Sequence, residues 1–170
     1  MTASVVCSVC GKSHPIGDTE LVFRLPEEIF LLNEEDRAAR CKITPDISTL
    51  DDRLFLRSLL PLPVEGQVKA YCIGVWVELS PQGLRTVMEL WDDPQQSVAP
   101  PIEGRLASKI PTQGPTSLGL FGSLKMIGPS SRPEFHIAQT DHPLFAQQQG
   151  GITAHVALTY SHFPDARSAV

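Results

Sequence analysis

Two cysteines and a histidine near the N-terminus form the most chemically specific pattern in this sequence. Cys7 and Cys10 are separated by two residues, Gly11 follows at once, and His14 comes four residues after Cys10. Two thiolates at this spacing can bind one Zn²⁺ at about 2.3 Å, at neighbouring corners of a tetrahedron. Gly11 can adopt a positive φ, which turns backbone N–H groups towards the sulfurs. The pattern predicts a zinc knuckle with Cys7, Cys10 and His14 as metal ligands.

A closed structural zinc site needs a fourth ligand, and the sequence has no second Cys-x-x-Cys pair. The other cysteines and histidines are the candidates: Cys41, Cys72, His136, His142, His155 and His162. The pair could instead be unmetallated thiols with a packing role, or a redox dithiol. The redox interpretation is disfavoured, because a thioredoxin-like dithiol opens a helix and Gly11 and Pro15 oppose a helix after Cys10.

His142 is the main candidate for chemistry outside the knuckle. It lies between an aspartate and a proline, where it could be a ligand, a general base or a helix-start residue bonded to a carboxylate; the last is the commoner role. An open zinc site of Cys7, Cys10 and His14 with a bound water, and His142 as base, would define a metal- or thiol-dependent enzyme. This is the alternative to a structural site.

The remaining reactive side chains favour structural roles. Cys72 lies within an apolar run and is expected to be a small buried residue, and Cys41 follows the basic end of a predicted helix. The adjacent acids at 51–52 and 92–93 are expected on turns, where neighbouring side chains point apart. The sequence has no nucleophile elbow, no phosphate-binding glycine loop and no His-Glu-x-x-His helix. No catalytic or cofactor-binding residue is predicted.

The composition favours one globular domain in the cytoplasm. At 170 residues with 42% apolar content, the chain is long enough for a core without disulfides. The longest apolar stretch, residues 71–77, is far shorter than the roughly 20 residues of a membrane span, and the first residues lack the features of a secretory signal. Cytoplasmic thiols stay reduced, which favours metal binding by a close cysteine pair.

The charge distribution bears on possible partners. The formal net charge is −5, and lysines and arginines are scattered without a basic stripe. Nucleic acid is therefore an unfavourable partner, because its phosphates would be repelled. Neither a membrane nor a nucleic acid is expected as a partner, whereas a protein is; one version is neutralisation of a basic partner such as a toxin.

Periodicity and breaker residues predict an α+β fold: a mainly antiparallel sheet with short helices packed on it. Residues 1–170 are expected to be a single domain, with a knuckle loop at 1–18, an α+β body at 19–165 and a tail at 166–170. The loop is expected to contain no regular element, and residues 94–101 an irregular connection too polar for the core. Strands are predicted at 54–60, 69–79 (the central strand), 118–127 and 133–139, the last two as a hairpin.

Helices are predicted where caps and prolines mark their starts. The clearest begins after Ser80, with Pro81 in its first position and apolar side chains at 84, 87, 88 and 91, the i, i+3, i+4, i+7 spacing of one helical face. The others are expected at 26–32, after Asn33, from Asp141 to Gly150, and at 152–163, where the pattern fits both structures and helix is preferred to strand.

Several short motifs follow one another along the chain: Cys7-x-x-Cys10-Gly11-x-x-His14, Phe55-Leu56-Arg57, Gly74-Val75-Trp76-Val77-Glu78-Leu79-Ser80, Glu89-Leu90-Trp91, Arg132-Pro133, Asp141-His142-Pro143-Leu144 and Gln148-x-x-Gly151-Ile152. In this order they resemble the bacterial family called Domain of Unknown Function 2199, from Cys7 to about Thr153. The resemblance implies an α+β domain with the knuckle and no established activity.

Three positions depart from the family pattern. A family cysteine just after an aspartate is Ser48 here, following Asp46, so a fourth zinc ligand at that position would be missing. A glycine after the Phe-x-Arg motif is Ser58, and a Gly-Trp-Leu motif has become residues 104–106 with Arg105 in the middle. A pocket at these positions would be altered. The combined expectation is a cytoplasmic binding or protein-interaction protein with a structural zinc knuckle.

Overall fold

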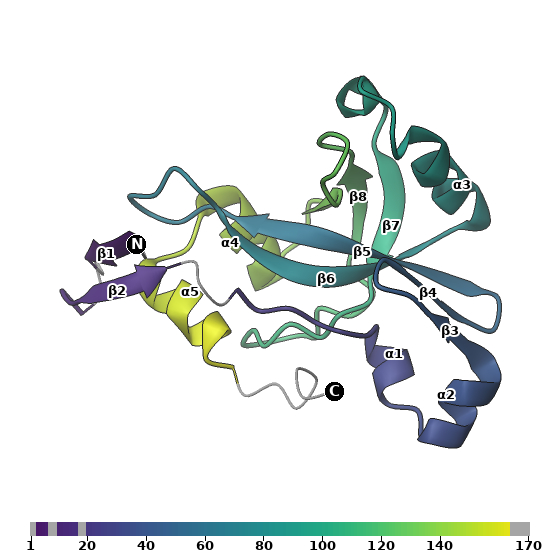
Figure 1. Cartoon of the computed structure of the whole chain (residues 1–170). Coiled ribbons are helices and arrows are strands. Elements are labelled where there is room, and N and C mark those ends of the chain that lie inside the picture. The colour runs from purple at the N-terminus through teal and green to yellow at the C-terminus, as the bar shows by residue number, and fades with distance from the viewer. Residues whose placement is uncertain (1–2, 7–9, 17–19, 164–170) are drawn as a thin grey trace.

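The computed structural model describes residues 3–6, 10–16 and 20–163. Seven strands form one sheet in the order β3-β4-β5-β6-β7-β8-β9, and a further pairing between β5 and β9 closes it into a small barrel (Figure 1). The strands are β3 (Cys41–Ile43), β4 (Ile47–Leu50), β5 (Arg53–Leu62), β6 (Tyr71–Leu79), β7 (Ile102–Leu106), β8 (Phe121–Lys125) and β9 (Glu134–Ile137). Neighbours are antiparallel except β5 and β9, which are parallel. The predicted α+β class and mainly antiparallel sheet are confirmed; the barrel closure was not predicted.

Strand β5 changes its partner part-way along its length. It pairs with β4 as far as Leu56 and with β9 at Leu59. Between these points the Arg57 amide donates to the Asp46 carbonyl at 2.8 Å, and the Leu59 amide donates to the Pro133 carbonyl at 2.9 Å. The segments before β4 and before β9 therefore meet beside the middle of β5.

The core explains why β6 has a continuous apolar sequence. Ile73, Val75 and Val77 share one face with the paired positions of β5 and are fully buried. On the other face Trp76 is also fully buried, and its indole Nε1 donates to the Phe23 carbonyl at 2.9 Å. A strand covered on both faces has no polar alternation, so the prediction of a central strand is confirmed.

The helices are α1 (Glu27–Phe30), α2 (Glu34–Arg40), α3 (Pro81–Leu90), α4 (Pro143–Gly150) and α5 (Ala154–Ser161), with a short 3₁₀ helix η1 (Gln96–Val98). All the predicted helices are present. The side chains of Asn33 and Ser80 accept hydrogen bonds from backbone amides of the first turns of α2 and α3, as expected of N-caps. Helix α4 is capped by His142, one residue later than the predicted Asp141.

One sequence prediction about an irregular segment is wrong, and a second holds except at one residue. The N-terminal segment contains strands β1 (Ala3–Val6) and β2 (Ser13–Ile16), paired antiparallel as a separate sheet. Pro15 lies in β2, an edge strand of this two-stranded sheet, and Gly11 lies between the two strands, so neither prevents the pairing. Connection 94–101 contains only the short η1 and is mostly exposed, as predicted. The exception is Gln96, whose buried side-chain amide donates to the carbonyls of Leu90 and Trp91, at 3.0 and 2.8 Å. A polar side chain can be buried when its hydrogen bonds are satisfied.

Candidate functional site

A groove lies where β5 changes partners. A hollow of about 470 Å³ is lined by Leu59, Ile127, Arg132 and two serines, together with Asp46 and Trp91. A second hollow, of about 260 Å³, adjoins it through the same Asp46 and Trp91 and reaches Thr44, Ile47 and Met88. We call the two hollows together the Trp91 groove. Its walls come from four segments far apart in sequence: the turn before β4 with the start of that strand, the middle of β5, the end of α3, and the loop between β8 and β9.

Local sequence features place the side chains of the groove. Helix α3 buries Val87 completely, but Met88, the next position on its apolar face, is 54% exposed, and Trp91 at the C-cap is only partly buried. The β8–β9 loop turns through Gly128 and Ser130, both at positive φ, which a compact loop between two strands requires here. The loop carries Ile127, 37% exposed, to the opposite wall.

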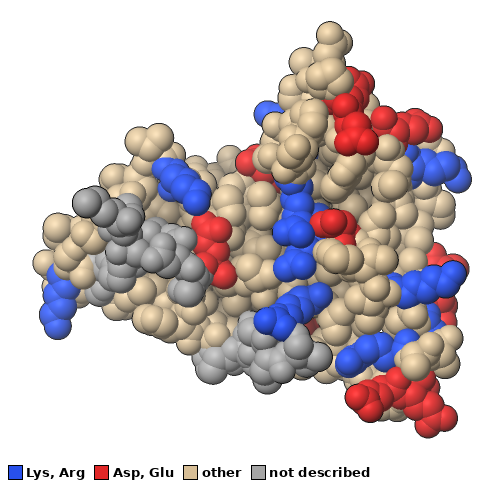
Figure 2. Space-filling model, viewed as in Figure 1, with Lys and Arg blue, Asp and Glu red and all other residues tan. Residues whose placement is uncertain are grey.

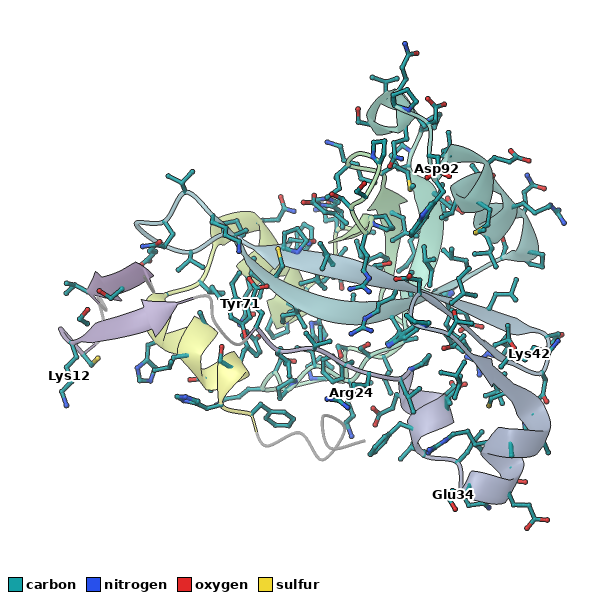
Figure 3. All side chains as sticks on the ribbon, in the orientation of Figure 1. Lys12, Arg24, Glu34, Lys42, Tyr71 and Asp92 are labelled. Carbon is teal, nitrogen blue, oxygen red and sulfur yellow. The ribbon has the colours of Figure 1, made fainter. Side chains whose placement is uncertain are left out.

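Basic side chains dominate the electrostatics beside the groove. The Arg132 Nε donates to the Asp46 carboxylate at 2.9 Å, which ties the β8–β9 loop to the turn before β4. The Arg57 guanidinium lies over the Trp76 ring, 5.9 Å from its centroid. Burial, and then the positive charges of Arg132 and Arg24, lower the pKa of Arg57, while Asp46 acts in the opposite direction. Figure 2 shows several Lys and Arg side chains across the middle of the face that it draws, with acidic side chains beside them, and Arg24 is labelled below β6 in Figure 3.

Comparison with known proteins gives one match. The model of the bacterial family DUF2199, described as an uncharacterized protein conserved in bacteria, matches residues 6–152. The chain belongs to this family. No curated protein and no solved structure matches the chain significantly.

The fold brings together three of the short motifs that resemble DUF2199. Arg57 comes from β5, Trp91 from the end of α3, and Arg132 from the loop before β9. Trp91 and Arg132 line the Trp91 groove. Arg57 lies close enough to Arg132 for the two charges to interact. Sequence reasoning did not identify this site. The available signal was Met88 and Trp91, apolar residues at the end of a helix followed by a polar loop.

Ser48, at the position where the family pattern has a cysteine, lies in the described part of the chain. Ser48 lies on β4, is completely buried, and its Oγ has no hydrogen-bond partner among the described residues. Strand β4 and the β1–β2 hairpin lie on opposite sides of the molecule (Figure 1). A cysteine at this position would therefore be too far from the knuckle to be its fourth ligand.

The knuckle itself stays a prediction. Cys7 and the His14 side chain lie outside the described part of the chain, whereas Cys10 is exposed in the turn between β1 and β2. Gly11 has φ +68°, the left-handed conformation expected of it. The side chains that the structure describes contain no group of three or more His, Cys, Asp or Glu that could hold a metal ion, a finding that does not bear on Cys7 or His14.

His142 has a structural role. The ring is 3% exposed; its Nε2 donates to the Pro115 carbonyl at 2.9 Å and its Nδ1 accepts from the Leu144 amide at 3.1 Å. Both nitrogens are occupied by backbone groups, so the ring caps α4 and fastens the loop at Pro115. The partners are backbone groups rather than the expected carboxylate, and neither nitrogen is available to a metal or a substrate.

The other candidates also have structural surroundings. Cys72 is partly buried, and desolvation raises its pKa to about 11, which disfavours the thiolate. Burial raises the pKa of Cys41 as well. His136 lies 3.1 Å from the Glu134 carboxylate on the same strand. Within the described residues, no helix combines the length and apolar character that a membrane crossing requires.

Proposed function

We propose that this DUF2199 protein is a cytoplasmic protein-interaction domain that binds a segment of a partner protein in the Trp91 groove. The observation that carries the proposal is the partly exposed Trp91 between two exposed apolar side chains, Met88 and Ile127, with Arg132 beside them. Tryptophan and arginine are enriched among the residues that dominate protein–protein binding energy, and methionine adapts to varied partners.

The exposure of the lining favours a peptide over a small molecule. Sites for small molecules enclose most of the ligand surface, whereas Met88 and Ile127 remain 54% and 37% exposed. An extended segment crossing both hollows would cover Met88, Trp91 and Ile127 in turn and remove their apolar surface from water. Burial of such surface stabilises a complex by roughly 25 cal/mol per Å² before the costs of association.

The fluorescence of Trp91 offers a direct test. The chain has two tryptophans, and Trp76 is completely buried. A change of emission on addition of a ligand to the groove can therefore be assigned to Trp91. Peptides selected from a random displayed library are expected to shift this emission, and the shift should be lost in Trp91→Phe. Met88→Ala should weaken binding about tenfold, and Val98→Ala, 82% exposed and outside the groove, should leave it unchanged. Peptides that bind Met88→Ala and Trp91→Ala as tightly as the natural protein would refute the proposal.

We also propose a structural zinc site at the knuckle, formed by Cys7, Cys10 and His14. Two observations support it: the β1–β2 hairpin, which carries Cys10 and His14 on either side of Gly11, and the packing of α5 against β2. Helix α5 carries His155, and His162 is its C-cap, which makes these two the best candidates for the fourth ligand. A His142-dependent enzyme has no support, since both ring nitrogens are occupied.

Elemental analysis of protein purified without a metal-binding tag tests the zinc site. One zinc per chain is expected, with loss in Cys7→Ser and Cys10→Ser. These variants should also unfold more easily, because zinc can contribute on the order of 10 kcal/mol to the folding of a small site. His155→Ala and His162→Ala identify the fourth ligand, and Cys41→Ser serves as the control because it lies on β3, away from the hairpin. Metal-free protein with unchanged stability in the cysteine variants would refute the site.

A further inference from the structure

We infer that the segment bound in the Trp91 groove carries an anionic side chain, a carboxylate or phosphoryl group, which Arg57 and Arg132 receive. The inference rests on the proposed function and names the chemistry of the ligand. It starts from the hydrogen bonds that Arg57 lacks. A guanidinium has five N–H donors, yet among the described residues Arg57 makes one long hydrogen bond, from Nη1 to the Pro45 carbonyl at 3.4 Å.

The donors of Arg57 are costly to leave unpaired. Its Nε is buried and has no partner among the described residues. A buried donor without an acceptor loses its hydration without replacement, and the penalty is larger when the group is charged. An incoming anion cannot reach the buried Nε, but it can accept from the Nη groups, whose one hydrogen bond among the described residues is long. Such a charge-assisted hydrogen bond would offset part of the cost of holding the guanidinium charge there.

The charges around Arg57 also favour an anion. Arg132 and Arg24 add positive potential at Arg57, and the one negative group that acts on it, Asp46, already accepts from Arg132. Arg53 provides the contrast, four residues earlier on the same strand. Its guanidinium forms two hydrogen bonds with the Glu78 carboxylate, at 2.8 and 2.7 Å, and also pairs with Glu28. Arg53 is neutralised by the protein itself, whereas Arg57 is not.

The guanidinium of Arg57 is held in place before any ligand arrives. It lies over the ring of Trp76, which is fixed by complete burial and by the hydrogen bond to the Phe23 carbonyl. Its own backbone is fixed by pairing with Trp76 and by the hydrogen bond to Asp46. A rigid, planar fork loses little side-chain entropy when it binds an anion.

The first test uses inorganic anions and needs no peptide. At equal ionic strength, sodium phosphate or sodium acetate is expected to raise the melting temperature by about 3 °C relative to sodium chloride. The rise should disappear in Arg57→Met and persist in Arg85→Gln, whose guanidinium is exposed on α3 and bonds to Gln82. The larger response of phosphate or acetate distinguishes a phosphoryl from a carboxylate ligand. If neither anion stabilises the natural protein, the inference is refuted.

The second test uses the peptides selected for the groove. They are expected to contain an acidic residue, and its replacement by glutamine should weaken binding about tenfold to a hundredfold. In Arg57→Met, or in Arg132→Gln if the first variant is unstable, the two peptides should bind equally, which isolates the pairwise contribution. Peptides that bind at Trp91 without any acidic residue would refute the anion inference and leave the protein-interaction proposal standing. If anions stabilise the protein through Arg57 but no peptide binds, the protein-interaction proposal is refuted and the anion site at Arg57 stands.

Discussion

Replacing Gln148 by leucine is expected to loosen the closure of the barrel. Gln148 lies on α4 and is 6% exposed. Its Oε1 accepts from the Ile137 amide at 2.8 Å, and its Nε2 donates to the Phe135 carbonyl at 2.9 Å and to the Pro61 carbonyl at 3.4 Å. One amide thus joins β9 to β5 across the seam where these two strands share a single bridged pair.

The size of the effect follows from the groups left behind. Leucine has a similar volume, so no large cavity forms, but the Ile137 amide and the Phe135 carbonyl lose their partner in the core. Each such group costs about 1–3 kcal/mol. The apolar surface of leucine offsets about 1 kcal/mol of this sum. A net loss of about 1–5 kcal/mol in the free energy of unfolding is expected, corresponding to a fall of roughly 2–20 °C in melting temperature for a chain of this length.

The measurement is urea unfolding followed by circular dichroism, with unchanged slope m taken as evidence of a two-state transition. Gln149→Leu is the matched control, because Gln149 is the next residue of α4 and is exposed. It should change the free energy by no more than about 0.5 kcal/mol. A Gln148→Leu variant as stable as the control would show that α4 does not hold the seam, and the account of the barrel closure would be wrong.

Three further perturbations have defined outcomes. Gly122→Ala should cost about 3 kcal/mol or more by thermal unfolding, because its Cβ would lie 2.3 Å from a backbone carbonyl of β9, whereas Gly150→Ala, with no atom within 4 Å, should be neutral. The Arg53 guanidinium lowers the pKa of Glu78. The contribution of this ion pair to stability is therefore complete above the ordinary carboxyl pKa and is lost as the pH falls through the lowered pKa. Arg53→Met should flatten the loss of stability between about pH 5 and pH 3, measured by unfolding at a series of acid pH values. With its pKa raised to about 11, Cys72 should remain unmodified by iodoacetamide at about pH 8 under native conditions when followed by mass spectrometry, and rapid alkylation there would contradict its burial.

The elements that local signals specify were predictable from the sequence. Ser80 and Pro81 mark the start of α3 by capping chemistry and fixed φ, and the apolar run of β6 follows from burial on both faces. Strand β7 was missed because Gly104 interrupts its alternation. A Cβ there would lie 2.6 Å from the Val77 side chain, so the glycine serves the close approach of two strands. That reason lies in a neighbour distant in sequence.

The Trp91 groove was not predictable for the same reason. Asp46, Trp91 and Arg132 are far apart along the chain, and they meet because β5 exchanges β4 for β9 at Arg57. No local pattern specifies such an exchange. The sequence did predict the chemistry of the isolated motifs, including the positive φ of Gly11, but it assigned Met88 to the core-facing stripe of α3, and the structure leaves it mostly exposed.

The exchange of partners by β5 creates a boundary between two units of different local stability. Strands β3 and β4 are held to the barrel along the first half of β5, whereas the second half belongs to the closed ring. The outer pair can therefore open locally without breaking the ring, so its amides should exchange with solvent faster than those of β6. Asp46, one wall of the Trp91 groove, lies at the boundary between the two units. A bound segment that spans this boundary would stabilise the closed form, and it would slow exchange in β3 and β4 as well as in the residues that it touches.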